Sequence, residues 1–297
     1  MRIGVLANER SWYLRDLRRA AEFRHEICPV SFESLAAELG NGPLHVTSAQ
    51  HELHPLDAVL VRTMPPGSLE QVIFRMDVLA GLESTGCLVS NPPKAIEIAV
   101  DKYLALFRLA QSGLRVPRTY ACQTALDGME AFQKLGGDVV LKPLFGSEGR
   151  GVTRLADEEL AFHAFRLLES LGAVIYLQEF IPHTEGDCRI LVMGDRQFGM
   201  RRRNPHDWRT NVSRGALTEP LEIDDQLATV ARRAAIAVGA NVAGVDLLPH
   251  QDGQLYVLEV NAVPGWKRLA KVLDVDIAQV LLNHVQTLVT QTKKGIS

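Results

Sequence analysis

The strongest constraint on the fold is a pair of apolar segments near the end of the chain, each carrying one acidic residue. Residues 241–248 and 254–260 have the Val and Leu runs typical of adjacent strands, and they contain Asp246 and Glu259. A lone carboxylate among apolar side chains is costly unless it is paired or binds a ligand. With Asn261, the two carboxylates would form an oxygen-only site of the kind that Mg²⁺ prefers when it also holds phosphates. The alternative is three polar strand-end residues that face water.

The size and composition of the chain narrow the classes of protein to consider. Its 297 residues are 46 % hydrophobic, which predicts a sizeable core and two or three structural units. The net charge of -3 argues against a general nucleic-acid binder, which normally carries a basic face. No apolar run is long enough for a membrane span, and the apolar start is too short for a signal peptide.

The cysteines indicate the redox compartment. Cys28, Cys87, Cys122 and Cys188 lie far apart and form no Cys-x-x-Cys pair. Neither a zinc knuckle nor a disulfide scaffold is therefore expected. Reduced thiols in a cytoplasmic protein are the simplest account.

Strands and helices alternate at the beginning of the chain. The patterns predict strands at 3–7, 58–62 and 87–90, and helices at 12–23 and 68–83. This alternation favours a small α/β layer with a parallel sheet. Pro92 and Pro93 mark the expected boundary of this layer, because proline ends strands and presets a helix start.

The rest of the chain mixes helices with short strands and hairpins. We expect helices at 94–111, 128–135, 157–171, 221–238 and 277–289. Strands are expected at 139–143, 152–155 and 174–180, and a hairpin joins 188–193 to 197–203 around Gly194 and Asp195.

A glycine-rich turn joins two of these strands. Lys142 ends the first strand, and the turn reads Gly146-Ser147-Glu148-Gly149-Arg150-Gly151. Glycines let backbone amides approach a ligand closely, successive amides can form an anion nest, and the lysine adds a point charge for a phosphate. The spacing matches neither a Walker A motif nor a dinucleotide-binding fingerprint. The alternative is a flexible hairpin with a surface lysine.

Two further motifs are less specific. The strand end Gln178-Glu179-Phe180-Ile181-Pro182 could bind an adenine edge, or it could be a strand end capped by proline. Arginines at 201–203 and 209 could bind an anionic small ligand in bidentate fashion, or they could line a solvated strand. His51 and His54 have no third ligand nearby, so both are expected at the surface.

Taken in chain order, the motifs form a recognisable series. They are Asp101-Lys102, Lys142 with the glycine loop, Gln178-Glu179-Phe180-Ile181, Asp187-Cys188-Arg189, Arg209-Thr210-Asn211, Arg214-Gly215, Val-Ala-Gly-Val-Asp246 and Glu259-Val-Asn261-Ala-Val-Pro-Gly265. This series resembles the ATP-grasp carboxylate–amine ligases, and within them the RimK-type glutamate ligases, over about residues 92–290. The resemblance implies an α/β (α+β) chain, an ATP-grasp fold preceded by a small parallel α/β domain. Residues 1–92 would form that domain, 93–182 the lid-bearing part and 183–297 the C-terminal part.

The resemblance also implies roles for individual residues. ATP would contact Lys102, Lys142, Gly146, Ser147, Gly149, Gly151, Glu179, Phe180, Ile181, Asp187, Arg209, Thr210 and Asn211, of which Arg209 and Asn211 would also be catalytic. Asp246, Glu259 and Asn261 would hold two Mg²⁺ ions, with Mn²⁺ as a substitute. Arg189, Arg202, Arg203, Arg214 and Trp266 would bind the substrates, Trp266 by stacking on the acceptor unless it anchors the last helix instead.

The segment from Asn261 to Lys267 is similar to the glutamate ligases that act on pterin coenzymes in methanogens and methylotrophs. It departs from the amino-carrier-protein ligases, which typically carry Pro-Glu-Phe-Lys-Asn after the metal-site asparagine. The expected function is ATP-dependent joining of L-glutamate to a carboxylate acceptor of the tetrahydromethanopterin type, through an acyl phosphate. The alternatives are a RimK-like modifier of a protein C-terminus and an inactive ATP-binding regulator. We expect small-molecule substrates, a homo-oligomer, and no nucleic-acid or membrane partner.

Overall fold

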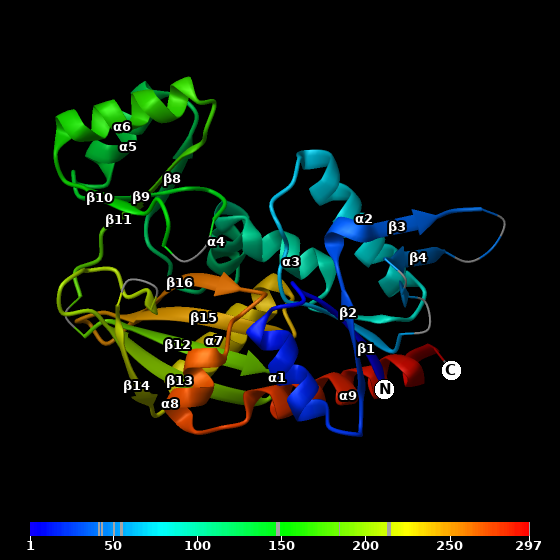
Figure 1. Cartoon of the computed structure of the whole chain (residues 1–297). Coiled ribbons are helices and arrows are strands. Elements are labelled where there is room, and N and C mark those ends of the chain that lie inside the picture. The colour runs from blue at the N-terminus through cyan, green and yellow to red at the C-terminus, as the bar shows by residue number, and fades with distance from the viewer. Residues whose placement is uncertain are drawn as a thin grey trace.

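The computed structural model describes residues 1–40, 42, 44–49, 51–53, 56–146, 149–183, 185–212 and 215–296. Its elements form an N-terminal part, a small antiparallel unit and a large antiparallel sheet (Figure 1). Among the described residues, no helix combines the length and hydrophobicity needed to cross a membrane.

The N-terminal part contains the expected parallel sheet. Its strand order is β2-β1-β6-β7, with β1 (Arg2–Leu6), β2 (Glu26–Val30), β6 (Ala58–Val61) and β7 (Leu88–Ser90). Helices α1 (Trp12–Ala21) and α2 (Leu69–Ser84) connect these strands as the alternation predicted. The edge strand β2 was not expected, because it contains Pro29, and proline is tolerated only at the edge of a sheet.

A short antiparallel sheet projects from this part and was also not expected. After a 3₁₀ turn, η1 (Phe32–Ser34), it consists of β3 (Leu35–Glu38), β4 (His45–Ser48) and β5 (His51–Glu52). His51 is exposed, as predicted, whereas His54 lies outside the described residues.

The helix predicted over 94–111 is two helices, α3 (Pro93–Val100) and α4 (Lys102–Gln111). The backbone of Asp101 is extended, and its side chain accepts hydrogen bonds from the amides of Tyr103 and Leu104. Asp101 therefore caps a new helix. The break places Lys102 in the first turn of α4.

The small antiparallel unit, residues 119–179, has the strand order β10-β9-β11-β8. Its strands are β8 (Thr119–Cys122), β9 (Val139–Lys142), β10 (Thr153–Leu155) and β11 (Ile175–Glu179). Helices α5 (Ala125–Lys134) and α6 (Glu158–Ser170) cover the face turned away from the large sheet, as Figure 1 shows.

The large sheet has the order β14-β13-β12-β15-β16. Its strands are β12 (Asp187–Met193), β13 (Arg196–Arg203), β14 (Leu217–Leu221), β15 (Val242–Pro249) and β16 (Leu255–Asn261). One face packs against α4 and α7 (Asp225–Val238), and the other against α8 (Lys267–Leu273) and α9 (Ile277–Ile296). The helix predicted from 221 starts four residues later, because 217–221 is an edge strand that tolerates Pro220.

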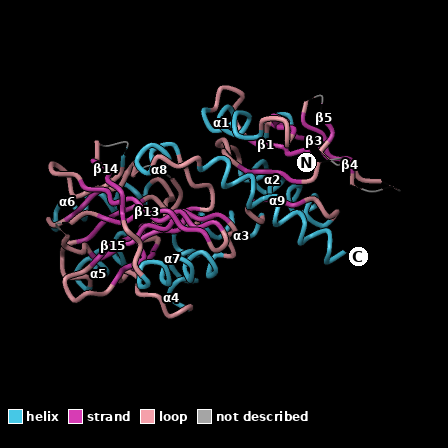
Figure 2. The backbone as a smooth tube through the Cα atoms, turned by 90° about the horizontal axis from the view of Figure 1, so that it is seen from below, coloured by secondary structure: helices cyan, strands magenta, loops and turns pink. Residues whose placement is uncertain are grey.

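Helix α9, at the C-terminal end of the chain, packs against the N-terminal part. It runs from the large sheet alongside the N-terminal sheet (Figure 2), and its side chains share one apolar core with β1, α1 and β6. Ion pairs join Arg19 to Asp276 at 2.8 Å and Lys293 to Asp57 at 2.6 Å. The N-terminal part is therefore packed into the same body as the large sheet.

Candidate active site

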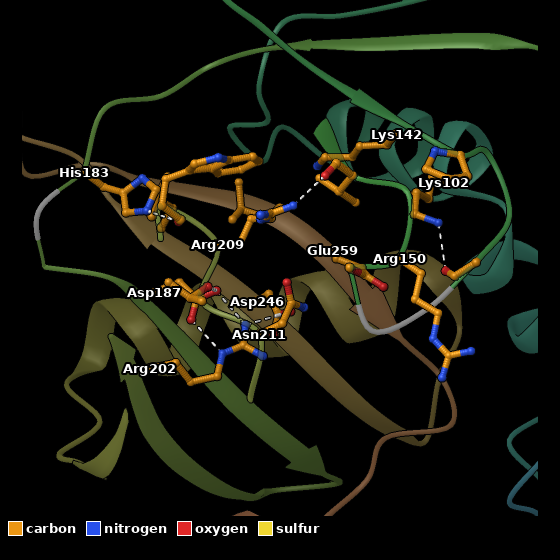
Figure 3. A pocket seen from close by; sticks show the side chains of 18 residues that line it. Lys102, Lys142, Arg150, His183, Asp187, Arg202, Arg209, Asn211, Asp246 and Glu259 are labelled. Atoms are coloured by element: carbon orange, nitrogen blue, oxygen red, sulfur yellow. Dashed lines mark hydrogen bonds and ion pairs between the residues drawn. The ribbon is translucent and has the colours of Figure 1, made fainter. Parts of the chain in front are cut away.

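A pocket lies between the small antiparallel unit and the large sheet (Figure 3). Its lining residues are Lys102, Lys142, Pro143, Gly146, Gly149, Arg150, Val152, His183, Asp187, Arg202, Trp208, Arg209, Thr210, Asn211, Asp246, Leu248, Leu258 and Glu259. The fold thus brings together most of the residues that the motifs singled out, from segments more than a hundred residues apart in the sequence.

The two carboxylates lie opposite each other on neighbouring strands. Asp246 of β15 pairs in register with Glu259 of β16, and both line the pocket. The register shifts directly after Asp246, so that Leu247 pairs with Val257 and Leu258 is the extra residue of a bulge. This bulge lets Leu258 and Glu259 both line the pocket, although strict alternation would separate them.

Asp246 is buried and is held by two arginines. Its oxygens accept hydrogen bonds from Arg189 Nε at 2.7 Å and Nη2 at 3.1 Å, and Arg202 Nη2 lies 3.0 Å away. Burial opposes the charged form, but the two guanidinium groups outweigh it and lower the pKa of Asp246. The carboxylate therefore stays ionised at neutral pH, the state in which it can also bind a cation.

Asn261 lies two residues beyond Glu259 on β16, but it does not line the pocket. Its Oδ1 accepts a hydrogen bond of 2.8 Å from the amide of Val263. Within the described part of the chain, no three His, Cys, Asp or Glu side chains form a complete metal site. Asp246, Glu259 and Asn261 are all hard oxygen donors at one end of a strand pair, so they fit Mg²⁺ that takes its remaining ligands from phosphate and water.

Two lysines face the carboxylates from the other side of the pocket (Figure 3). Lys142 is half-buried and donates to the neutral side-chain oxygen of Gln178. Burial lowers the pKa of Lys142 to about 8, although the charge of Glu259 acts in the opposite direction. Lys102 Nζ donates to the carbonyls of Gly146 at 2.9 Å and Leu144 at 3.3 Å, and burial lowers its pKa as well.

Gln178 fixes the position of the Lys142 ammonium group. Only 2 % of its surface is exposed, and its amide nitrogen donates to Thr119 Oγ1 at 3.1 Å and to the Tyr176 hydroxyl at 3.2 Å. The Tyr176 hydroxyl in turn donates to the Lys102 carbonyl at 3.4 Å. Among the described residues, no carboxylate is bonded to either lysine ammonium group, which favours an anionic ligand such as phosphate.

The glycine loop approaches the large sheet closely. Gly149 has φ 68°, and a Cβ atom there would collide with the side-chain oxygen of Asn211. Gly151 has φ 72°, and its Cβ would lie 2.8 Å from Pro143 Cγ. Both positions therefore need glycine. The predicted phosphate contact Ser147 lies outside the described residues, as does Arg214.

The segment 207–211 forms another wall of the pocket. Arg209 pairs with Asp207 at 2.7 Å and donates to the Val152 carbonyl at 3.0 Å, which links the large sheet to the small unit. Thr210 donates to Asp187 Oδ2 at 2.6 Å. The two oxygens of Asp187 also accept hydrogen bonds from Arg202 at 2.7 and 2.6 Å.

The predicted adenine edge lies beside the pocket. Glu179, Phe180 and Ile181 do not line it, but their neighbours Trp208 and His183 do. Phe180 packs edge-on against Trp208, with ring centroids 5.6 Å apart, and carries the Arg154 guanidinium 3.6 Å from its centroid. His183 bridges the carbonyls of Ile181 and Trp208 at 3.0 and 2.9 Å.

Seven lining residues were not predicted as site residues: Pro143, Arg150, Val152, His183, Trp208, Leu248 and Leu258. Leu248 could have been found, because it lies two residues after Asp246 on a strand and so on the same face. Arg150, His183 and Trp208 lie within or beside predicted motifs. Nothing in the sequence indicates the bulge that brings Leu258 to the pocket.

The predicted substrate residues lie in different surroundings, and among those that the structure describes Arg202 is the one that lines the pocket. Arg189 and Arg202 are engaged by buried carboxylates. Arg203 points to the opposite face of β13, where it forms an exposed ion pair with Glu185 at 3.0 Å. Trp266 is 2 % exposed and donates to Asp16 Oδ2 at 2.8 Å, so the prediction that its face stacks on the acceptor is wrong.

Known proteins are similar to this chain in sequence. Residues 99–285 match the RimK-like ATP-grasp domain. The tetrahydromethanopterin:alpha-L-glutamate ligase of Methanococcus maripaludis is 32 % identical over 290 residues, which cover 96 % of this chain and 97 % of that protein. The enzyme of the same name from Methanocaldococcus jannaschii is 32 % identical over 292 residues, which cover 96 % and 98 %.

Two solved structures have the same fold. A structure of the ATP-grasp ligase PsnB with a variant precursor, Mg and ADP has a TM-score of 0.76 at 23 % identity and covers 98 % of both chains. The RimK domain ATP-grasp protein of Sphaerobacter thermophilus has a TM-score of 0.72 at 22 % identity, and the match covers 96 % of this chain and 100 % of the Sphaerobacter chain.

Proposed function

Because the chain belongs to the RimK-like ATP-grasp family, we propose that it is an ATP-dependent ligase that joins L-glutamate to a carboxylate acceptor of the tetrahydromethanopterin type. The observation that carries this proposal is the pocket itself. Two half-buried lysines, Lys102 and Lys142, face the cross-strand carboxylates Asp246 and Glu259. Such a site suits a polyphosphate bound together with a divalent cation.

In the proposed reaction, an acceptor carboxylate oxygen attacks the γ-phosphorus of ATP, and ADP leaves. The amine of glutamate then attacks the acyl carbon, and inorganic phosphate leaves. Lys102 and Lys142 would neutralise the phosphate oxygens, and Arg209 and Asn211 would contact the transferred group. No covalent nucleophile is needed from the protein.

Asp246, Glu259 and Asn261 would hold two Mg²⁺ ions, for which Mn²⁺ could substitute. When bound, the metal would supply charge neutralisation at the phosphates. Asp187 would contact the ribose, and Glu179, Phe180 and Ile181 the adenine, beside Trp208 and His183.

We also propose a cytoplasmic homo-oligomer, with 1–92, 93–182 and 183–297 as its functional units. The four described cysteines are free thiols, which suits that compartment.

A second acceptor class is supported by one specific observation. Because Trp266 is buried, it offers no flat face for a pterin. Some solved proteins of this fold carry precursor peptides, among them a PsnB complex. The second candidate is therefore glutamate addition to the C-terminal carboxylate of a peptide or protein. The names of the relatives at 32 % identity favour the pterin acceptor.

A screen of ADP release tests the proposal. Purified protein would be given ATP, Mg²⁺ and L-glutamate with tetrahydromethanopterin, a folate, or a set of peptides ending in a free carboxylate. The proposal expects ADP release and a product one glutamate heavier only with the pterin. Turnover only with peptides would favour the second candidate, and no turnover with any acceptor would contradict the proposal.

A further inference from the structure

Arg62, the residue directly after β6, is a buried cation that the proposed reaction does not use. It is 8 % exposed, and burial lowers its pKa to about 10, so it remains protonated at neutral pH. Its Nη2 donates to the carbonyl of Pro264 at 2.6 Å. Its guanidinium lies 4.5 Å from the ring of Trp266 and 5.2 Å from that of Tyr13, and its Nε has no hydrogen-bond partner among the described residues.

The segment that Arg62 holds is the loop 261–266, which follows β16. Other N-terminal residues hold the same loop. Asn91 donates to the Ala262 carbonyl, and Tyr13 approaches Gly265 so closely that a Cβ atom there would collide with its hydroxyl. Asp16 accepts a hydrogen bond of 2.8 Å from Trp266 Nε1. The N-terminal part thus contacts four of the six loop residues, Ala262, Pro264, Gly265 and Trp266.

This loop begins with a proposed metal ligand. The Oδ1 atom of Asn261 accepts a hydrogen bond from Val263, the residue before Pro264. A shift of the Pro264 carbonyl would therefore move the amide that orients the Asn261 side chain. Arg62 is suited to prevent such a shift, because a planar guanidinium can donate to a carbonyl and stack on aromatic rings at the same time.

We propose that Arg62 is a positioning residue for the metal site: it fixes the loop 261–266 and thereby the orientation of Asn261, without touching metal or substrate. The inference rests on the proposed function, since Asn261 matters in this way only if the site binds a divalent ion. It assigns to the N-terminal part a share in metal binding. Changes to groups that orient metal ligands typically weaken metal affinity by about 10–100-fold.

The chain offers a matched control for Arg62. Arg75 is also buried, at 5 % exposure, donates to a proline carbonyl, that of Pro65, at 2.8 Å, and lies 5.8 Å from an aromatic ring, that of Phe32. Its contacts, however, lie within the N-terminal part. Arg62→Met and Arg75→Met should therefore both lower the melting temperature, whereas only Arg62→Met should affect the metal.

The experiment is a titration of the full chain with Mn²⁺ in the presence of ADP, followed by electron paramagnetic resonance. Arg62→Met is expected to weaken Mn²⁺ binding about 10–100-fold, and Arg75→Met to leave it within about twofold of the unaltered chain. Arg62→Lys, which keeps the charge and most of the stem, serves if Arg62→Met does not fold, and it should weaken binding by a smaller factor. Amide hydrogen exchange in the loop 261–266 should rise in both Arg62 variants.

Unchanged Mn²⁺ binding in a folded Arg62 variant would overturn the inference and leave the proposed function standing. Equal weakening in the Arg62 and Arg75 variants would also overturn it, because the effect would then be a general loss of stability. Failure of the unaltered chain to bind Mn²⁺ with ADP would overturn the proposed metal site itself.

Discussion

Lys142 shows how much of the site depends on a single half-buried charge. Its ammonium group is oriented by a neutral amide, that of Gln178, and burial holds its pKa at about 8. A glutamate in place of Gln178 would compensate the charge and compete with phosphate. The sequence predicted the lysine as a phosphate contact, but it did not indicate the residue that positions it.

The pKa of Lys142 predicts a pH dependence of ATP binding. The ammonium loses its proton as the pH rises through about 8, so ATP affinity should fall between about pH 7 and about pH 9. Bound phosphate should raise the pKa, so binding near pH 9 should take up protons. Calorimetric titration in buffers of different ionisation enthalpy measures both effects.

Lys142→Met is the control. It lacks the lysine, so any pH dependence of binding that it still shows comes from another group, such as the phosphates of ATP. Its ATP affinity should be weaker by about 1.5–3 kcal/mol near pH 7, and the additional fall at higher pH should be absent. If the unaltered chain and Lys142→Met show the same pH dependence, Lys142 is not the group responsible.

Glu259→Gln tests the metal site at the scale of one residue. The change keeps the shape of the side chain but removes one negative charge, so turnover should fall by on the order of 100-fold and the Mg²⁺ requirement should rise. The melting temperature should change little, because Glu259 is not part of an apolar core. Glu219→Gln, at an exposed ion pair, is the control. Near-normal turnover of Glu259→Gln at ordinary Mg²⁺ would refute the metal role.

At the scale of elements, strand alternation separates residues that the sequence presents as one cluster. Arg202 points into the buried network with Asp187 and Asp246, whereas Arg203 points to the other face of β13. The arginine run was interpreted as a single anion site, although the hairpin that contains it was predicted. Applying the two-residue period to that hairpin would have excluded one of the two arginines.

Because the two side chains lie on different faces, we expect the two substitutions to change the unfolding free energy by very different amounts. Arg202→Met leaves buried carboxylates undercompensated and should cost about 3–5 kcal/mol of unfolding free energy. Arg203→Met breaks only an exposed pair and should change it by less than about 0.5 kcal/mol. Urea denaturation measures both. Equal effects of the two substitutions would contradict the assigned faces of β13.

Periodicity predicted most helices and buried strands, and it failed where local chemistry overrode it. β2 and β14 contain proline, which argues against a strand except at an edge. The break at Asp101 depends on a cap whose hydrogen bonds cannot be seen in a hydrophobic pattern. The sequence left two roles for Trp266, stacking on the acceptor or anchoring the last helix, because it does not show which residues cover the ring. Only the fold brings Tyr13 and Asp16 to it.

At the scale of the whole molecule, the two ends of the chain share one core. Ile3, Leu14 and Leu17 of the N-terminal part are buried together with Leu282 and Val285 of α9. Trp266 belongs to the same cluster. The N-terminal part therefore supports the large sheet as well as the loop 261–266.

A fragment that begins at Pro93 should not fold cooperatively. Removing residues 1–92 would expose the apolar face of α9 and the ring of Trp266, so the fragment should lack a sharp thermal transition in near-ultraviolet circular dichroism. The full chain is the reference. A fragment with a cooperative transition and native-like ATP binding would show that the shared core is dispensable.

The most direct test of the central claim follows an oxygen atom through the reaction. The acceptor that supports ADP release would be labelled with ¹⁸O in its carboxylate and incubated with unlabelled ATP, Mg²⁺ and L-glutamate. If the carboxylate attacks the γ-phosphorus and the acyl phosphate is then opened by the amine, one ¹⁸O atom appears in each inorganic phosphate released. Mass spectrometry or the isotope shift in ³¹P magnetic resonance measures it. Phosphate without ¹⁸O, formed while the labelled acceptor is converted to product, would contradict the acyl-phosphate mechanism.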